Sequence, residues 1–329
     1  MGQTFEHEVV VIGAGPAGMC AAMYAGRAML NTVVLERGFP GGELLNTETI
    51  EDYPGFEHIL GTELAQKFHD HAAKFGATFK MGVTITTLRK RDDGMFESIA
   101  DNGDVYLSPT AIITAGGTPV KLGVPGELEY AGKGVSYCAI CDGAFFRNHV
   151  IAVVGGGDAA AEESDFLTRY ANKVYLIHRR DELRASKILQ RRVFENAKIE
   201  PLWDSVVDRV EADGQGLVHN LKVRNVNNGL VRDLAATGLF VFIGFRPNTG
   251  IIDGHVTHDD LGYLVTDANM QTSIPGLFAA GDVRAQLTRQ VTTAVGDATT
   301  AAIAAEKYLK GLRDGYRVPV IQGTGGYTA

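Results

Sequence analysis

Residues 6–28 read "EHEVVVIGAGPAGMCAAMYAGRA". A short run of β-branched residues leads into a glycine-rich turn, and an alanine-rich helical pattern follows it. Gly13, Gly15 and Gly18 have the spacing G-x-G-x-x-G. In a dinucleotide-binding unit the first glycine permits a tight turn, the second lets the backbone approach a pyrophosphate, and the third lets the helix pack closely on the strand. The stretch therefore predicts a strand–turn–helix that binds a dinucleotide.

The same design occurs twice in the chain. The first copy continues into a strand, "NTVVLERG", that contains Glu36, where a carboxylate would accept hydrogen bonds from ribose hydroxyl groups. Residues 149–170 repeat the strand, turn and helix as "HVIAVVGGGDAAAEESDFLTRY", with Gly155, Gly157 and Ala160 in the turn. Alternating strands and helices predict an α/β fold with parallel sheets, and the two copies predict two Rossmann-like dinucleotide-binding domains.

Two stretches that contain proline and glycine flank the second copy. They are "AGGTPVKLGVPG" at residues 115–126 and "IGFRPNTG" at residues 243–250. The simplest arrangement is a discontinuous first domain, residues 1–117 and 248–329, into which a second domain, residues 118–247, is inserted.

The two copies differ at the end of their second strand. His178 stands in the second copy where Glu36 stands in the first, and Arg179, Arg180 and Arg184 follow it. A cationic cluster at this place suits a ribose that carries a 2′-phosphate, which favours NADP over NAD. The alternative is a solvated basic face at the start of a helix. The first site lacks this cluster and the second has it, which predicts that FAD binds to the first domain and NADPH to the second.

The stretch "LFAAGDV" at residues 277–283 is predicted to be a buried strand that ends in Gly-Asp. Asp282 would there accept a hydrogen bond from a ribityl hydroxyl of the flavin. The alternative is an ordinary turn aspartate at the end of a strand.

Cys138 and Cys141 form a C-x-x-C motif within "SYCAICDGAFF". Zinc would need about four ligands, and the sequence contains no second C-x-x-C and no H-x₃₋₅-H. Two buried structural cysteines are another alternative. The favoured hypothesis is a redox dithiol, in which one thiolate attacks a disulfide and its neighbour resolves the mixed disulfide. Asp142 would move protons beside the pair or serve only as a turn residue, and Cys20 is predicted to lie in the core.

Composition excludes several classes of protein. The chain has 329 residues, 45% of them hydrophobic, and a net charge of −8, which argues against non-specific binding to nucleic acid or to an anionic membrane surface. Three cysteines do not make a secreted disulfide framework. No signal peptide or membrane span is evident, so a cytoplasmic location is expected. The glycine-rich tail "VPVIQGTGGYTA" is expected to be mobile.

Taken in order, the motifs resemble those of the low-molecular-weight, NADPH-dependent thioredoxin reductases over nearly the whole length. They are "GAGPAG", "GGELLNTETIEDYPGF", "CAICDGAFF", "GGGDAAAEE", "HRRDELRA", "IGFRPNT", "FAAGDV" and "RQVTTAVGDA". The resemblance implies non-covalently bound FAD, NADPH as electron source, thioredoxin as disulfide substrate and a homodimer. It implies that Cys141 lies nearest the flavin, that Cys138 attacks the protein substrate and that Asp142 is the acid–base. It also implies a domain rotation, for which the two linkers are candidate hinges.

The resemblance also implies the cofactor-binding residues and no metal site. Glu43 departs from the family, which usually has glutamine in "GGQL", and this departure leaves the tuning of the flavin open. The implied FAD set is Gly13, Gly15, Pro16, Ala17, Gly18, Glu36, Arg37, Gly42, Glu43, Leu44, Asp52, Thr114, Ala115, Gly116, Gly281, Asp282, Arg289, Gln290 and Val291. The implied NADPH set is Gly155, Gly157, Asp158, His178, Arg179, Arg180 and Arg184.

Three other functions are compatible with parts of this pattern. A flavin dithiol oxidase of the same fold would need no NADPH, and the intact arginine cluster argues against it. A relative that takes electrons from ferredoxin or another carrier would usually have a degraded nucleotide site. A redox sensor without turnover would need an output domain, and nothing in the sequence resembles one.

Overall fold

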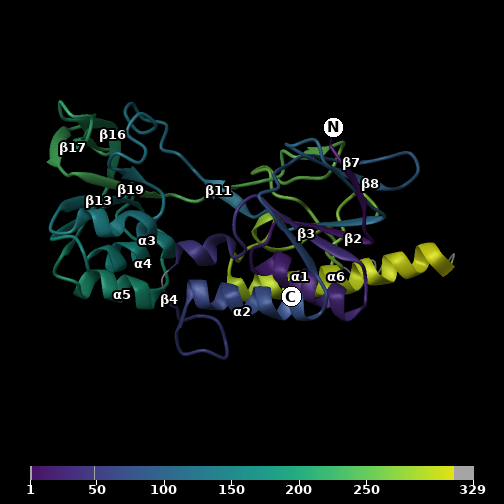
Figure 1. Cartoon of the computed structure of the whole chain (residues 1–329). Helices are drawn as coiled ribbons and strands as arrows, with labels where there is room; N and C mark the ends of the chain where they lie inside the picture. Colours follow the sequence, from purple (N-terminus) through teal and green to yellow (C-terminus); the bar gives the residue numbers. More distant parts are fainter. Residues whose placement is uncertain (1, 48, 315–329) are drawn as a thin grey trace, which may run out of the picture. The chain divides into compact units, whose positions relative to one another are not determined.

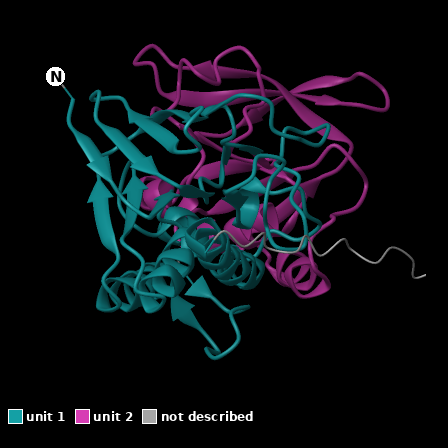
Figure 2. Ribbon diagram, turned by 90° about the vertical axis from the view of Figure 1, so that its right-hand side faces the viewer, with its two compact units in different colours: residues 1–118, 246–329 teal, residues 119–245 magenta. Residues whose placement is uncertain are grey.

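The computed structural model describes residues 2–47 and 49–314 (Figure 1). Contacts divide the chain into two compact units (Figure 2). Unit 1 comprises residues 1–118 and 246–329, and unit 2 comprises residues 119–245. The inserted domain predicted from the sequence, residues 118–247, starts one residue earlier and ends two residues later than unit 2.

The chain passes between the units twice. The two crossing segments, β11 (Gly117–Pro119) and β20 (Phe245–Pro247), pair in a two-stranded sheet. None of the helices in the described part of the chain is both long and apolar enough to span a bilayer. The glycine-rich tail falls outside the described residues.

Unit 1 is built on a five-stranded parallel sheet. Four of its strands are buried and largely apolar because both faces of the sheet are covered there, whereas the edge strand at residues 78–81 is mostly exposed. Helices α1 (Pro16–Arg27) and α6 (Val291–Asp314) pack on one face. In sheet order the strands are β22 (Leu277–Ala279), β10 (Thr110–Ile113), β2 (Val9–Ile12), β3 (Thr32–Glu36) and β6 (Thr78–Met81).

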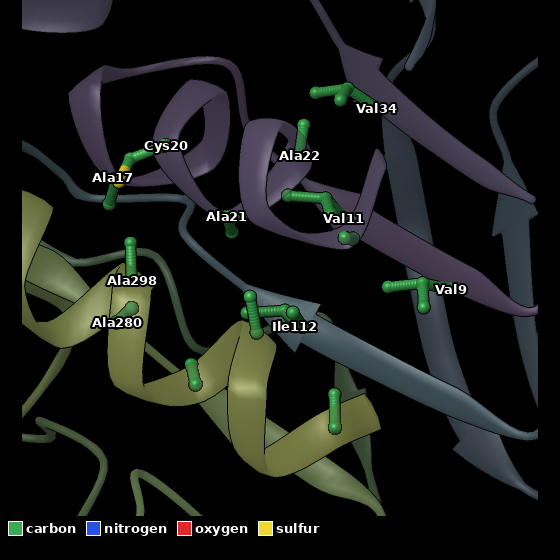
Figure 3. Packing of buried hydrophobic residues seen from close by; sticks show 14 of the residues in the cluster. Val9, Val11, Ala17, Cys20, Ala21, Ala22, Val34, Ile112, Ala280 and Ala298 are labelled. Atoms are coloured by element: carbon green, nitrogen blue, oxygen red, sulfur yellow. The ribbon is translucent and has the colours of Figure 1, made fainter. Parts of the chain in front are cut away.

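Side chains along β2 alternate between two cores. Val9 and Val11 join the cluster formed with α1 and α6, where small side chains such as Ala21 and Ala298 let the two helices approach closely (Figure 3). Val10 faces the other way, into a cluster shared with a second sheet. In order that sheet contains β1 (Thr4–Glu6), β9 (Val105–Ser108), β8 (Phe96–Ala100), β7 (Ile85–Lys90) and β21 (Ile252–Asp253). The remaining elements of unit 1 are η1 (Gly42–Asn46), β4 (Thr49–Ile50), β5 (Ile59–Leu60), α2 (Gly61–Lys74) and η3 (Gly281–Val283).

Unit 2 repeats the parallel sheet with its own core. A three-stranded antiparallel sheet packs beside it through a further apolar cluster. The prediction of an α/β fold with two Rossmann-like domains, one inserted into the other, is confirmed. The parallel strands in sheet order are β12 (Val135–Ser136), β19 (Gly238–Phe242), β13 (Val150–Gly155), β14 (Lys173–Ile177) and β15 (Ile199–Leu202). The other elements are α3 (Ala139–Asp142), η2 (Gly143–Phe146), α4 (Asp158–Leu167), α5 (Lys187–Glu195), β16 (Ser205–Ala212), β17 (Val218–Asn225) and β18 (Val231–Ala235).

Candidate active site

The first glycine turn links β2 to α1. Gly13 has φ +105°, and a Cβ on Gly18 would lie 1.8 Å from the carbonyl oxygen of Gly13, so neither position accepts a side chain. A Cβ on Gly15 would meet only the Cα of Gly42, at 4.0 Å. The protein therefore requires the first and third glycines for its own packing, whereas the second leaves open space that a ligand can fill.

Glu36 closes this turn from the end of β3. Its Oε2 accepts a hydrogen bond from the N–H of Ala14 at 2.8 Å, and its Oε1 accepts one from the N–H of Gly38 at 2.8 Å. Each carboxylate oxygen has a further lone pair, so both remain able to accept from a ribose hydroxyl. Glu36 thus shapes the turn as well as offering an acceptor, a second role that the sequence did not reveal.

Other members of the predicted FAD set surround the same turn. The hydroxyl of Thr114 donates to the carbonyl oxygen of Gly13 at 2.8 Å, and a Cβ on Gly42 would lie 3.1 Å from the Cα of Gly15. Segments from β10 and η1 therefore adjoin the glycine turn. Arg37 and Asp52 are exposed, and Asp52 lies between β4 and β5.

Asp282 lies in η3, directly after β22. Burial raises the pKa of Asp282 to about 6; the neighbouring Arg289 opposes this rise, while Glu43 and Asp297 add to it. A Cβ on Gly281 would lie 3.0 Å from that of Ala17, which places η3 beside the start of α1. A hydrogen-bond donor from a ligand would stabilise the ionised carboxylate and lower its pKa again.

The second glycine turn links β13 to α4 in unit 2. A Cβ on Gly155 would lie 2.3 Å from the carbonyl oxygen of Phe242 and 2.5 Å from the Cβ of Ala160. A Cβ on Gly157 would have no protein atom within 4 Å. As in unit 1, the second glycine of the motif faces open space.

His178 lies beneath this turn and is only 5% exposed. Burial lowers its pKa, and Arg184, Arg180 and Arg179 lower it further. The side chains of these three arginines are exposed, and the backbone N–H of Arg184 donates to the carbonyl oxygen of Gly156 at 2.7 Å. The structure therefore places the arginine cluster beside the glycine turn.

Cys138 and Cys141 are joined by a disulfide at the start of α3. The N–H of Cys141 donates to the Sγ of Cys138 at 3.2 Å, and Asp142 follows as the last residue of the helix. Cys141 is exposed and Cys138 half-buried, whereas Cys20 is buried in α1. The bonded pair supports the redox hypothesis over separate structural cysteines. Within the described residues, no group of three or more His, Cys, Asp or Glu side chains could hold a metal ion.

The sequence did not reveal what holds the residue before the disulfide. The hydroxyl of Tyr137 donates to Oε1 of Glu127 at 2.9 Å, and this fully buried carboxylate also accepts from the N–H groups of Leu122 and Gly123 at 2.8 and 2.6 Å. Lys121 places its ammonium 3.0 Å from the centre of the Tyr137 ring. A glutamate in a Pro-Gly loop carries no spacing signal, so only the fold identifies it.

The chain as a whole is similar to several known proteins. The sequence profile described as pyridine nucleotide-disulphide oxidoreductase matches residues 7–298. The chain is 45% identical to a thioredoxin reductase of Listeria monocytogenes over 94% of this chain and 95% of the relative. It is 44% identical to one of Bacillus subtilis over 94% and 96%. A crystal structure of Lactococcus lactis thioredoxin reductase in its FR conformation is 43% identical and superposes with a TM-score of 0.89, covering 92% of this chain and 99% of that one.

Proposed function

Because this chain belongs to the pyridine nucleotide-disulphide oxidoreductase family, we propose that it is a thioredoxin-disulfide reductase that uses NADPH to reduce oxidised thioredoxin. The observation that carries the proposal is the Cys138–Cys141 disulfide, which precedes η2 and β13, the strand that leads into the second glycine turn. The arginine cluster beside that turn favours NADPH over the electron sources of a dithiol oxidase or a ferredoxin-linked relative.

We propose FAD as the cofactor of unit 1. Its residues fit the group, because Gly15 leaves open space at the start of α1, Glu36 offers acceptors for a ribose, and the partly buried carboxylate of Asp282, whose pKa is raised by burial, can accept from a ribityl hydroxyl. When bound, FAD supplies the two-electron acceptor that links a nicotinamide to a disulfide. In unit 2, Gly157 leaves equivalent space for the pyrophosphate of NADPH, and the arginines would hold its 2′-phosphate.

The thiol half of the reaction is thiol–disulfide exchange. Once two electrons and two protons have opened the Cys138–Cys141 disulfide, the thiolate of Cys138 attacks one sulfur of oxidised thioredoxin, and the other sulfur leaves as a thiolate. Cys141 then attacks the Cys138 sulfur of the mixed disulfide, which releases dithiol thioredoxin and restores the internal disulfide. We assign Asp142, at the end of the same short helix, to the proton transfers.

The remaining assignments are also proposals. We propose a homodimer, on the family resemblance, and a cytoplasmic location, where NADPH is supplied. The linkers that contain β11 and β20 are the proposed hinges of a domain rotation, since the disulfide must meet the flavin and a bulky protein partner at different times.

An anaerobic titration with NADPH, and separately with NADH, tests the proposed function. Flavin absorbance around 450 nm should bleach at low NADPH concentration and far less readily with NADH, and oxidised thioredoxin should restore it. A bound flavin that NADPH cannot bleach would favour the dithiol oxidase or the alternative donor. A protein that shows this bleaching but no turnover with a disulfide would favour the sensor.

Replacing Gly157 by alanine should separate nucleotide binding from folding. The new methyl group meets no protein atom, so the melting temperature should stay unchanged, but it would fill space proposed for the pyrophosphate, so the KM for NADPH should rise about tenfold or more. Gly155→Ala is the matched control, because its methyl group collides with Phe242 and Ala160 and should cost about 3 kcal/mol of stability. Thermal unfolding and steady-state kinetics of both variants check this, and an unchanged KM in Gly157→Ala would contradict it.

A further inference from the structure

A largely buried ion pair in unit 1 lies beside Asp282, the carboxylate proposed to bind FAD. Nη1 of Arg284 and Oδ2 of Asp297 are 2.8 Å apart, and the two side chains are only 13% and 12% exposed. Arg284 follows η3, and Asp297 belongs to α6. Neither residue belongs to the set that the sequence motifs assigned to FAD.

The pair is linked, directly through Asp297 and through Gln286 beside Arg284, to the peptide groups on both sides of Gly281. The N–H of Gly281 donates to Oδ2 of Asp297 at 3.2 Å. Its carbonyl oxygen accepts from the backbone N–H of Arg284 at 3.0 Å and from Nε2 of Gln286 at 3.1 Å. Arg284 also donates through Nε to Oγ1 of Thr266 at 2.8 Å and through Nη1 to Oε1 of Gln286 at 3.3 Å. One network therefore fixes the peptide groups that flank Gly281, which has φ +76°.

We propose that Arg284 and Asp297 are positioning residues for FAD, which hold Gly281 so that the next carboxylate, Asp282, is presented to the cofactor. The inference rests on the proposed function, since it takes FAD as the ligand of unit 1. It adds two residues that act through Gly281 and need not touch the cofactor themselves.

Stability alone is a weak reason for such a pair. Removing two charges from water is costly, and apolar side chains of similar volume often stabilise a fold as well or better. An ion pair with a forked guanidinium instead fixes geometry, because the rigid fork of Arg284 contacts Asp297, Thr266 and Gln286 at the same time. That arrangement in turn holds Gly281, the residue before Asp282.

Asp297→Asn tests the inference on the full-length holoprotein. The neutral amide leaves the cation of Arg284 without its partner and loosens Gly281, so FAD should dissociate about tenfold faster on dilution, measured by the rise in free-flavin fluorescence. The pH profile of this release should also move. Arg289, Glu43 and Asp297 are the charged groups that act on Asp282, and Asp297 raises its pKa. Removal of that negative charge should shift the midpoint of the profile to lower pH.

Arg284→Lys and Arg89→Gln complete the experiment. Lysine keeps the charge but loses the forked guanidinium, so the rate of FAD release should lie between those of the wild type and Asp297→Asn. Arg89, whose side chain is half exposed, forms an ion pair with Glu97 at 2.5 Å elsewhere in unit 1, and its loss should leave FAD release unchanged. If Asp297→Asn lowers only the melting temperature, while release and its pH midpoint match the wild type, the inference is wrong. A wild-type protein that holds no FAD would instead overturn the proposed function.

Discussion

Cys138→Ser is expected to abolish reduction of thioredoxin, with turnover at least ~10⁴-fold below the wild type, because a serine hydroxyl cannot attack a disulfide to form a mixed disulfide. Bleaching of the flavin by NADPH should persist, since the residues proposed to bind both cofactors are intact. Stopped-flow absorbance measures the first half of the reaction, and a coupled thioredoxin assay measures the second. A variant that still turns over would show that the other sulfur, or another group, is the attacking nucleophile.

Cys141→Ser separates the roles of the two sulfurs. Cys138 should still attack oxidised thioredoxin, but no neighbouring thiol can resolve the product, so a covalent complex should accumulate on a non-reducing gel. Cys138→Ser should trap none. The reverse pattern would exchange the two assignments. Cys20→Ser is the matched control, because Cys20 is a buried thiol of unit 1 and its loss should leave turnover unchanged.

Arg179→Gln combined with Arg180→Gln is expected to raise the KM for NADPH about 100-fold, through loss of two charge-assisted hydrogen bonds to the 2′-phosphate. The KM for NADH should change little, because NADH lacks that phosphate. The pKa of His178 should rise toward its ordinary value, since burial lowers it first and each arginine lowers it further. Steady-state kinetics with both nucleotides and NMR titration of the histidine check these outcomes.

Arg191→Gln controls for the loss of positive charge in unit 2. Arg191 is an exposed residue of α5 whose Nε lies 3.9 Å from Oε1 of Glu195. Its replacement should leave the KM values for NADPH and NADH unchanged. An equal loss of NADPH and NADH binding in the double variant would show that the cluster only supports the local fold. The preference for NADPH would then have another origin.

Local patterns explain which parts of the fold could be predicted from the sequence. Both glycine turns and the strands before them depend on residues within one short segment, so spacing alone identified Gly13, Gly18 and Gly155. The offset from each turn to the end of the next strand was also local, and it led to Glu36 and to the arginine cluster. Within each unit the structure places the end of the second strand beside the glycine turn, because parallel strands bring their carboxyl ends to one edge of the sheet.

The unpredicted parts depend on contacts between residues that have no shared pattern. The carboxylate of Glu127 meets the hydroxyl of Tyr137 across a loop, and Asp297 reaches Arg284 from a different element. Each is an ordinary charged or polar residue in sequence, and only burial beside its partner distinguishes it. The same holds for the second role of Glu36, whose bonds to Ala14 and Gly38 depend on the exact path of the turn.

The order of strands in unit 1 also constrains how the chain folds during synthesis. Strand β10 lies between β2 and β22, and β22 follows all of unit 2 in the chain. When residue 245 has emerged from the ribosome, unit 2 is complete. At that stage β10 still lacks its neighbouring strand β22, and α6 has not emerged. The inserted domain can therefore fold first, while the nascent first domain keeps an open sheet edge that invites aggregation or chaperone binding until its C-terminal segment emerges.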